Sequence, residues 1–185
     1  MLHGVDVSSY QSSFDTDGMA FVFVKATEGR SYINPKQSAQ AKKARDAGCV
    51  VGFYHFLWPG NIRAQAEYFV EECASVEEDL LAVDWEYTGE GTAAGNAEKD
   101  AFIREVKRLR PRHRVMLYCN RDFWLNRDTT SYAGDGLWIA DHVTAGKPRI
   151  KAKWVIHQYS STPLDKNVAN FKTTGALREW ATALR

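Results

Sequence analysis

Cysteine is scarce in this sequence, and no two cysteines have the spacing of a metal-binding or redox pair. The 185 residues contain three cysteines, Cys49, Cys73 and Cys119, and no Cys-x-x-Cys motif. Neither a disulfide framework nor a cysteine-rich metal site is therefore supported. All three lie in apolar stretches, so we expect buried free thiols.

Long apolar runs and an excess of one charge are also missing. No apolar run is long enough to span a bilayer, and the first residues lack the basic start and apolar stretch of an export signal. The 24 basic and 23 acidic residues leave a formal net charge of +1. Because no global field results, we expect neither nucleic acid nor a membrane as partner, and we look for function in a local site.

Several catalytic motifs are absent as well. No two histidines have His-x-x-x-His spacing, which disfavours a zinc amidase or peptidase, so we expect no metal and no cofactor. Ser8-Ser9 and Ser160-Ser161 lack the glycine pattern of a nucleophile elbow, which argues against a serine hydrolase. His55 and His157 fall within strand patterns, and we expect both to be structural.

Short apolar runs alternate with polar or helical stretches, as expected for strands joined by crossover helices. The length fits one compact domain over residues 1–185. Strands are predicted near residues 3–7, 21–26, 49–56, 80–86, 114–119, 137–141 and 154–159, with a weak eighth near 165–169.

Helices are predicted mainly in the first two thirds of the chain. Apolar faces mark segments near 62–73 and 102–109, and a third helix is expected from Pro35 to Ala47, with Gly48 as its stop. We therefore predict an α/β fold, a modified TIM-like barrel with about five β/α units and a simpler closing section. The alternative is an open doubly wound sheet, but no strand here is followed by a glycine-rich phosphate-binding turn.

Acidic residues stand at the ends of several predicted strands. Asp6 closes the first, Asp84 and Glu86 close the run 80–86, and Asp165 begins the last. The carboxyl ends of barrel strands share one face, where active sites are built, so acids far apart in sequence can converge there.

Asp84 and Glu86 are two residues apart, so on a strand they point to the same side, with bases about 6.6 Å apart. Repulsion between two carboxylates, with partial burial beside Trp85 or other aromatic residues, would raise one pKa. A protonated acid beside an ionised partner is what glycosidic cleavage needs. Strand-end acids can also simply cap helices or pair with basic residues, and an isolated Asp-x-Glu does not decide between these interpretations.

Ordered motifs run along nearly the whole chain. They are Gly4-Val5-Asp6-Val7-Ser8-Ser9, Phe23-Val24-Lys25-Ala26-Thr27-Glu28-Gly29, Tyr32-Ile33-Asn34-Pro35, Gly52-Phe53-Tyr54-His55-Phe56, Val83-Asp84-Trp85-Glu86, Leu117-Tyr118, Leu137-Trp138-Ile139-Ala140, Gln158-Tyr159-Ser160-Ser161 and Asp165-Lys166-Asn167. In these motifs the sequence resembles the family 25 glycoside hydrolases, bacterial and phage lysozymes that cut the β-1,4 bond between N-acetylmuramic acid and N-acetylglucosamine.

The resemblance implies five β/α units and three further strands, with the acids in one groove. It implies that Glu86 is the general acid and that Asp84 stabilises charge at the anomeric centre or orients the substrate's acetamido group. Asp6 and Asp165 would hold this arrangement and tune its pKa values.

The resemblance also implies substrate contacts from Lys25, Tyr32, Phe56 and Tyr118. Lys25 could instead pair with Glu28, and Phe56 and Tyr118 could fill the barrel. At Asp141-His142 relatives often carry a small residue followed by an aromatic one, so this rim departs from the family pattern.

The sequence is compatible with three functions. The first is cofactor-free hydrolysis of the peptidoglycan backbone by a monomeric catalytic domain. It would reach the bacterial wall as a phage lysin released from the cytoplasm or as a secreted enzyme. The second is a wall-binding module without turnover, and the third is hydrolysis of another amino-sugar polymer such as chitin.

Overall fold

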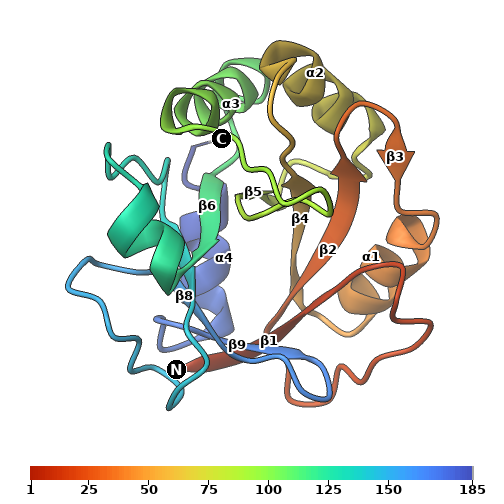
Figure 1. Cartoon of the computed structure of the whole chain (residues 1–185). Coiled ribbons are helices and arrows are strands. Elements are labelled where there is room, and N and C mark those ends of the chain that lie inside the picture. Colours follow the sequence, from red (N-terminus) through yellow and green to blue (C-terminus); the bar gives the residue numbers. More distant parts are fainter. Residues whose placement is uncertain (185) are drawn as a thin grey trace.

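The computed structural model describes residues 1–184 and contains a closed barrel of eight strands (Figure 1). Its strands are β1 (Leu2–Val7), β2 (Phe21–Glu28), β4 (Val50–Phe56), β5 (Leu80–Asp84), β6 (Val115–Asn120), β7 (Leu137–Ala140), β8 (Ile156–Ser160) and β9 (Asp165–Ala169). The short β3 (Tyr32–Ile33) pairs only with the end of β2. Because β1 pairs with both β2 and β9, the sheet closes. The predicted barrel is confirmed, and the open sheet is excluded.

The direction of β9 decides what meets at the end of the barrel. The strands from β1 to β8 run parallel in the barrel, whereas β9 is antiparallel to both β8 and β1. The start of β9 therefore lies at the carboxyl end of the parallel strands. As a result, Asp165 is the register partner of Asp6.

Helical segments occupy four of the connections between strands. They are α1 (Gln37–Asp46), α2 (Ile62–Glu72), α3 (Asn96–Leu109) and the π-helical η1 (Phe123–Arg127). In Figure 1, α1, α2 and α3 stand around the outside of the strands. The three helices predicted from sequence are confirmed, and Gly48, at φ +80°, follows α1 where a residue with a side chain would be strained.

The sequence pattern did not predict the last helix, α4 (Thr174–Thr182). Thr173 caps it, accepting a hydrogen bond from the backbone N–H of Ala176 at 3.0 Å. Leu177 and Ala181 are fully buried in the cluster that fills the barrel, next to residues that begin the strands, such as Phe21. The helix therefore covers the end of the barrel opposite the acids and leaves the carboxyl end for a site.

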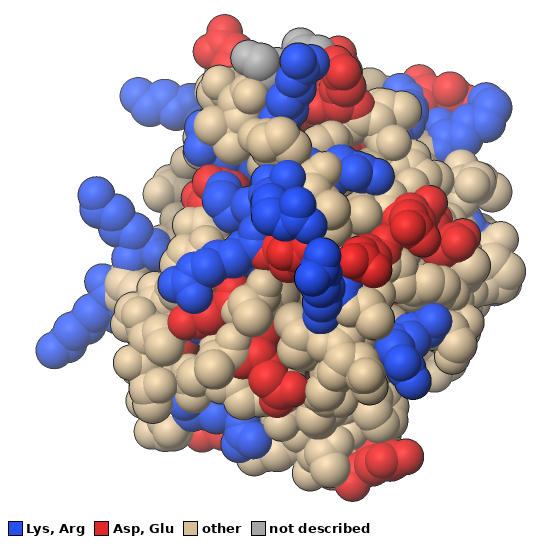
Figure 2. All heavy atoms as spheres, turned by 90° about the horizontal axis from the view of Figure 1, so that it is seen from above, with Lys and Arg blue, Asp and Glu red and all other residues tan. Residues whose placement is uncertain are grey.

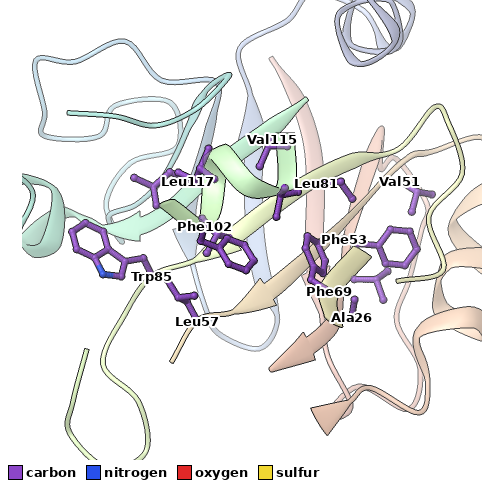
Figure 3. Packing of buried hydrophobic residues seen from close by; sticks show 14 of the residues in the cluster. Ala26, Val51, Phe53, Leu57, Phe69, Leu81, Trp85, Phe102, Val115 and Leu117 are labelled. Atoms are coloured by element: carbon purple, nitrogen blue, oxygen red, sulfur yellow. The ribbon is translucent and has the colours of Figure 1, made fainter. Parts of the chain in front are cut away.

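Two apolar clusters separate because side chains alternate along each strand. One faces the helices; Figure 3 shows Phe69 and Phe102 from α2 and α3 lying over the strands that carry Phe53 and Leu81. The other fills the barrel with Phe21, Phe23, Trp138 and their neighbours. Gly52 gives the Phe23 ring its space, because a Cβ at this position would lie 2.3 Å from that ring.

The outer face of α2 and α3 carries both signs of charge side by side (Figure 2). Arg63 pairs with Glu67 on α2, and Arg108 pairs with Glu105 on α3. All three cysteines are free, with Cys49 and Cys119 buried as expected and Cys73 half-buried. Among residues 1–184, no helix is long and apolar enough to cross a bilayer.

A buried lysine joins α3 to the loop that follows η1. Lys99 is fully buried; its Nζ lies 2.7 Å from Asp100 and 3.0 Å from Asp128, and it donates to the carbonyl of Tyr132 at 2.9 Å. The same ammonium group lies 5.2 Å from the centre of the Trp85 ring. The network therefore packs against the indole of Trp85, the residue between Asp84 and Glu86 in the sequence.

Lys99→Met should lower the free energy of unfolding by about 3–5 kcal/mol, because two buried carboxylates lose their counter-charge. Urea unfolding monitored by circular dichroism measures this. Lys42→Met is the matched control, since the side chains of Lys42 and Asp46 are 74% and 62% exposed and such pairs contribute little. Equal stability of the Lys99 variant and the wild type would contradict the assignment of Lys99 as the counter-charge of Asp100 and Asp128.

Candidate active site

A cavity of about 80 Å³ opens at the carboxyl end of the barrel strands. It is lined by the four sequence-predicted acids together with two tyrosines, a tryptophan and a glutamine: Asp6, Asp84, Glu86, Asp165, Tyr54, Tyr118, Trp138 and Gln158. A groove of about 540 Å³ adjoins it, sharing Glu86, Tyr118 and Gln158 in its wall. Of the four acids, Glu86 is thus the one that a polymer lying in the groove would contact.

Asp84 and Glu86 face the cavity from the end of β5. The strand ends at Asp84 rather than at residue 86 as predicted, but the backbone N–H of Trp85 still donates to the carbonyl of Tyr118 at 2.9 Å. Side-chain alternation therefore continues through Glu86. Trp85 points the other way, into the helix-facing cluster, and its indole donates to the carbonyl of Ala94 at 2.8 Å.

Of the two alternatives left open by the sequence, Trp85 or other aromatic residues, the structure shows the second, because Asp84 lines the cavity with Tyr54, Tyr118 and Trp138. Burial raises the pKa of Asp84 well above its ordinary value, and the charge and hydrogen bond of Glu86 raise it further. Within the described residues, the Oδ1 atom of Asp84 has no hydrogen-bond partner. The raised pKa means that this pair can hold a proton. Glu86 is half-buried and is the member of the pair nearer the groove.

Asp6 and Asp165 form a second carboxyl pair, from strands adjacent only through barrel closure. Burial raises the pKa of Asp6 well above its ordinary value, and the charge and hydrogen bond of Asp165 raise it further. The Oδ2 atom of Asp6 accepts hydrogen bonds from Gln158 Nε2 and Asn167 Nδ2, each at 2.9 Å. These amides fix the position of the Asp6 carboxyl in the cavity wall.

Sequence reasoning missed the polar partners that hold the acids in place. Asn167 is itself held by the Trp138 indole, which donates to its Oδ1 atom at 2.8 Å, and Tyr118 donates to Gln158 Oε1 at 3.1 Å. A usable signal was present for Asn167, because it lies two residues after Asp165 and so faces the same side of β9. Gln158 is identified only by strand register, since it pairs with Asn167.

The predicted substrate-contacting residues divide into two groups. Tyr118 lines both the cavity and the groove. Tyr32 borders a separate cavity of about 340 Å³, and Phe56, the register partner of Asp84, lines neither the central cavity nor the groove. Substrate contact by Tyr32 and Phe56 stays a prediction, and β3 carries Tyr32 away from the central cavity.

Lys25 lies close to Tyr32 and Phe56 and also affects Asp84. Its Nζ pairs with Glu28 at 2.6 Å, the alternative left open by the sequence, and lies 5.1 Å from the ring centres of both Tyr32 and Phe56. Its charge also lowers the pKa of Asp84, opposing the larger effect of burial. Lys25 thus acts on Asp84 through its charge, while its ammonium group is paired with Glu28.

The two strand histidines are structural, as predicted. His55 is fully buried between Thr27 Oγ1 at 2.7 Å and Gln65 Oε1 at 2.9 Å, and burial lowers its pKa to about 4. His157 is also fully buried and contacts the carbonyl of Asp141 at 2.6 Å. Throughout residues 1–184, no three histidine, cysteine or acidic side chains are grouped to hold a metal ion.

Comparison with known proteins agrees with this geometry. The family model for "Glycosyl hydrolases family 25" matches residues 5–168. The autolytic lysozyme of Clostridium acetobutylicum is 30% identical over 170 residues, covering 87% of this chain and 51% of the relative. Lysozyme M1 of Streptomyces globisporus is 28% identical over 185 residues, covering 87% and 62%. This chain thus spans about half to two thirds of the length of these relatives.

Solved structures of similar proteins have the same fold. The bacterial lysozyme from Streptomyces coelicolor superposes with a TM-score of 0.84 at 27% identity, covering 100% of this chain and 98% of that one. The muramidase from Acremonium alcalophilum superposes with a TM-score of 0.85 at 25% identity, covering 99% and 100%. Since the family model spans most of the sequence, this chain belongs to glycosyl hydrolases family 25.

Proposed function

We propose that this protein is a muramidase that hydrolyses the β-1,4 bond between N-acetylmuramic acid and N-acetylglucosamine in bacterial peptidoglycan. One observation carries the proposal: Asp84 and Glu86 line the same cavity, and Glu86 also lines the groove that adjoins it. The named activities of the relatives support the same reaction. The protein acts in this proposal as one catalytic domain over residues 1–185, as a monomer, on the wall.

Glu86 is assigned as the general acid because it is the member of its pair that lines the groove. It protonates the glycosidic oxygen as the bond to the anomeric carbon breaks, leaving positive charge on the sugar ring. The proton that the pair shares leaves through Glu86, so Asp84, deeper in the cavity, becomes the ionised partner that faces this charge or orients the acetamido group. Its Oδ1 atom, which has no hydrogen-bond partner within residues 1–184, would make that contact. A water molecule then adds to the anomeric carbon and gives a proton back to the Asp84–Glu86 pair, which completes hydrolysis.

Asp6 and Asp165 position Asp84 and Glu86 and do not themselves donate a proton to the substrate. Their own pair is held by Gln158 and Asn167, and the charge of Asp6 raises the pKa of Asp84. Tyr118, hydrogen-bonded to Gln158, lines the path between cavity and groove and offers an aromatic face to a sugar ring.

A wall-binding module without turnover fits the structure less well. A cavity that buries Asp6 and Asp84, with one Asp84 oxygen lacking a hydrogen-bond partner among residues 1–184, is costly to fold. Sugar binding alone requires no such arrangement. Hydrolysis of chitin remains the competing catalytic function, since both polymers present β-1,4-linked amino sugars.

Three assays on the purified protein separate these functions. A muramidase lowers the turbidity of purified bacterial walls and releases reducing sugar from them faster than from chitin. A binding module sediments with walls and releases no reducing sugar. A chitinase releases reducing sugar from chitin at the higher rate, and that result would overturn the proposal.

Exhaustive chelation should leave the rate of wall hydrolysis unchanged, because the proposed acids act by proton transfer and charge stabilisation. Rates before and after dialysis against EDTA, at matched ionic strength, make the comparison. Loss of activity that zinc or calcium restores would contradict the metal-free mechanism.

A further inference from the structure

The groove beside the acids contains an arginine whose guanidinium is only partly used. Arg121 follows β6, is half-buried and lines the groove with Glu86 and Tyr118. Its Nε atom donates to the backbone carbonyl of Arg149 at 2.9 Å. Within residues 1–184, its two terminal nitrogens make no hydrogen bond or ion pair. The side chain is therefore oriented while its two terminal donor groups remain available.

The carbonyl that orients Arg121 is itself fixed by a closed ion pair. The Asp141 carboxylate accepts from the Arg149 backbone N–H at 2.9 Å, from its Nε at 3.1 Å and from its Nη2 at 2.7 Å. These hydrogen bonds lower the pKa of Asp141. The charge of Arg149 is thus matched by Asp141. The charge of Arg121 also lowers the pKa of Asp141, but no carboxylate within residues 1–184 is hydrogen-bonded to Arg121.

The remaining polar groups of this wall are already engaged or bear the opposite charge. His142 Nε2 lies 3.0 Å from Gln158 Oε1; it is the donor there, because the Gln158 amide nitrogen donates to Asp6. Asp122 accepts from Asn126 at 2.7 Å, and Glu86 belongs to the acid pair. Arg121 is consequently the cation of this groove best able to accept an anionic partner.

We infer that Arg121 binds a carboxylate carried by the glycan strand, in the part of the groove continuous with the cleavage site. The inference rests on the proposed function and deepens it. An arginine fork matches a carboxylate in planar, two-pronged geometry. Peptidoglycan offers this group in its peptide stems or, where the stem is absent, on the lactyl group of muramic acid. Chitin has no carboxylate, so Arg121 favours muramyl glycans over chitin.

The test compares Arg121→Gln with wild type on four substrates. These are stem-bearing walls, peptide-free muramyl strands with a free lactyl carboxylate, and each of the two after carbodiimide amidation of its carboxyls. Arg112→Gln is the matched control, because it removes the same charge from a side chain that is 65% exposed and lies outside the groove. It should behave as wild type on all four.

Arg121→Gln should lower kcat/KM by about tenfold or more, mainly through KM, on the untreated substrate that supplies the carboxylate. On the amidated form of that substrate it should equal the wild type. Loss on stem-bearing walls alone assigns the stem carboxylates, and loss on peptide-free strands assigns the lactyl group. Dissociation constants of the same strands, measured in a Glu86→Gln background, should change in the same way without turnover.

Equal losses on amidated and untreated strands, or no loss on either, would overturn the inference while wild-type cleavage left the proposed function standing. Failure of the wild type to cleave any muramyl strand would overturn both. The two failures are therefore distinguishable from the wild-type rates alone.

Discussion

Glu86→Gln should lower kcat for wall hydrolysis by roughly a hundredfold or more, the usual contribution of a positioned general acid. The amide keeps the shape of the side chain and its place beside Asp84, but it has no acidic proton to give to the leaving oxygen. KM should change little, because the groove is intact. Initial rates of turbidity loss across a range of wall concentrations give both constants.

The matched control for this variant is Glu90→Gln, the same substitution four residues further along the loop. Glu90 is exposed and lines neither the cavity nor the groove, so its variant should retain the wild-type rate. Circular dichroism must show both variants folded. A folded Glu86→Gln protein with near-normal kcat would remove Glu86 from the chemistry.

Asp84→Asn should have opposite effects on activity and stability. Activity should fall by roughly a hundredfold or more, because the neutral amide cannot oppose the positive charge that develops at the anomeric centre. The melting temperature at pH 7 should rise by about 2 °C or more. The reason is that Asp84 is a buried carboxyl whose pKa is raised by burial and by Glu86.

The pH dependence of this stabilisation follows from the direction of the shift. As the pH rises above the ordinary aspartate pKa of 3.8, the unfolded chain releases the Asp84 proton while the folded protein retains it. Wild-type stability therefore falls until the raised pKa is passed. The asparagine amide of the variant does not titrate, so the gap in melting temperature between variant and wild type should be small near pH 3 and widen towards neutral pH.

Asp46→Asn serves as the control for these melting curves, because Asp46 is a largely exposed acid at the end of α1. Its melting temperature should stay within about 1 °C of the wild type at each pH. A lower melting temperature for Asp84→Asn at pH 7 would show that the Asp84 carboxylate stabilises the fold, and would contradict the raised pKa of this group.

Local patterns were enough to predict the barrel and the meeting of its acids. Strand alternation placed Asp84 and Glu86 on one side, and closure placed Asp6 beside Asp165, as the register shows. The extent of β5 was overestimated by two residues, and α4 was missed because its burial depends on the open barrel end that it covers. Helix amphipathicity is visible in sequence, but the surface against which a terminal helix packs is not.

The polar partners of the acids could not be predicted by the same reasoning. Gln158 and Asn167 reach Asp6 only because β8 and β9 pair in one register across the closure. Lys25 illustrates the converse case, since its partner Glu28 lies three residues away and was foreseen as an alternative. The position of Tyr32 outside the central cavity could not be predicted, because the two-residue strand that carries it leaves little pattern in the sequence.

The identity of the new reducing ends tests the central claim most directly. Walls digested by the protein are reduced with borohydride and hydrolysed, and the resulting amino-sugar alcohols are separated. A muramidase that uses Glu86 in this groove predicts muramitol as the product alcohol, in amounts that follow the turbidity loss and that Glu86→Gln does not generate. Glucosaminitol in its place, or turbidity loss without any new reducing end, would contradict muramidase action at this site.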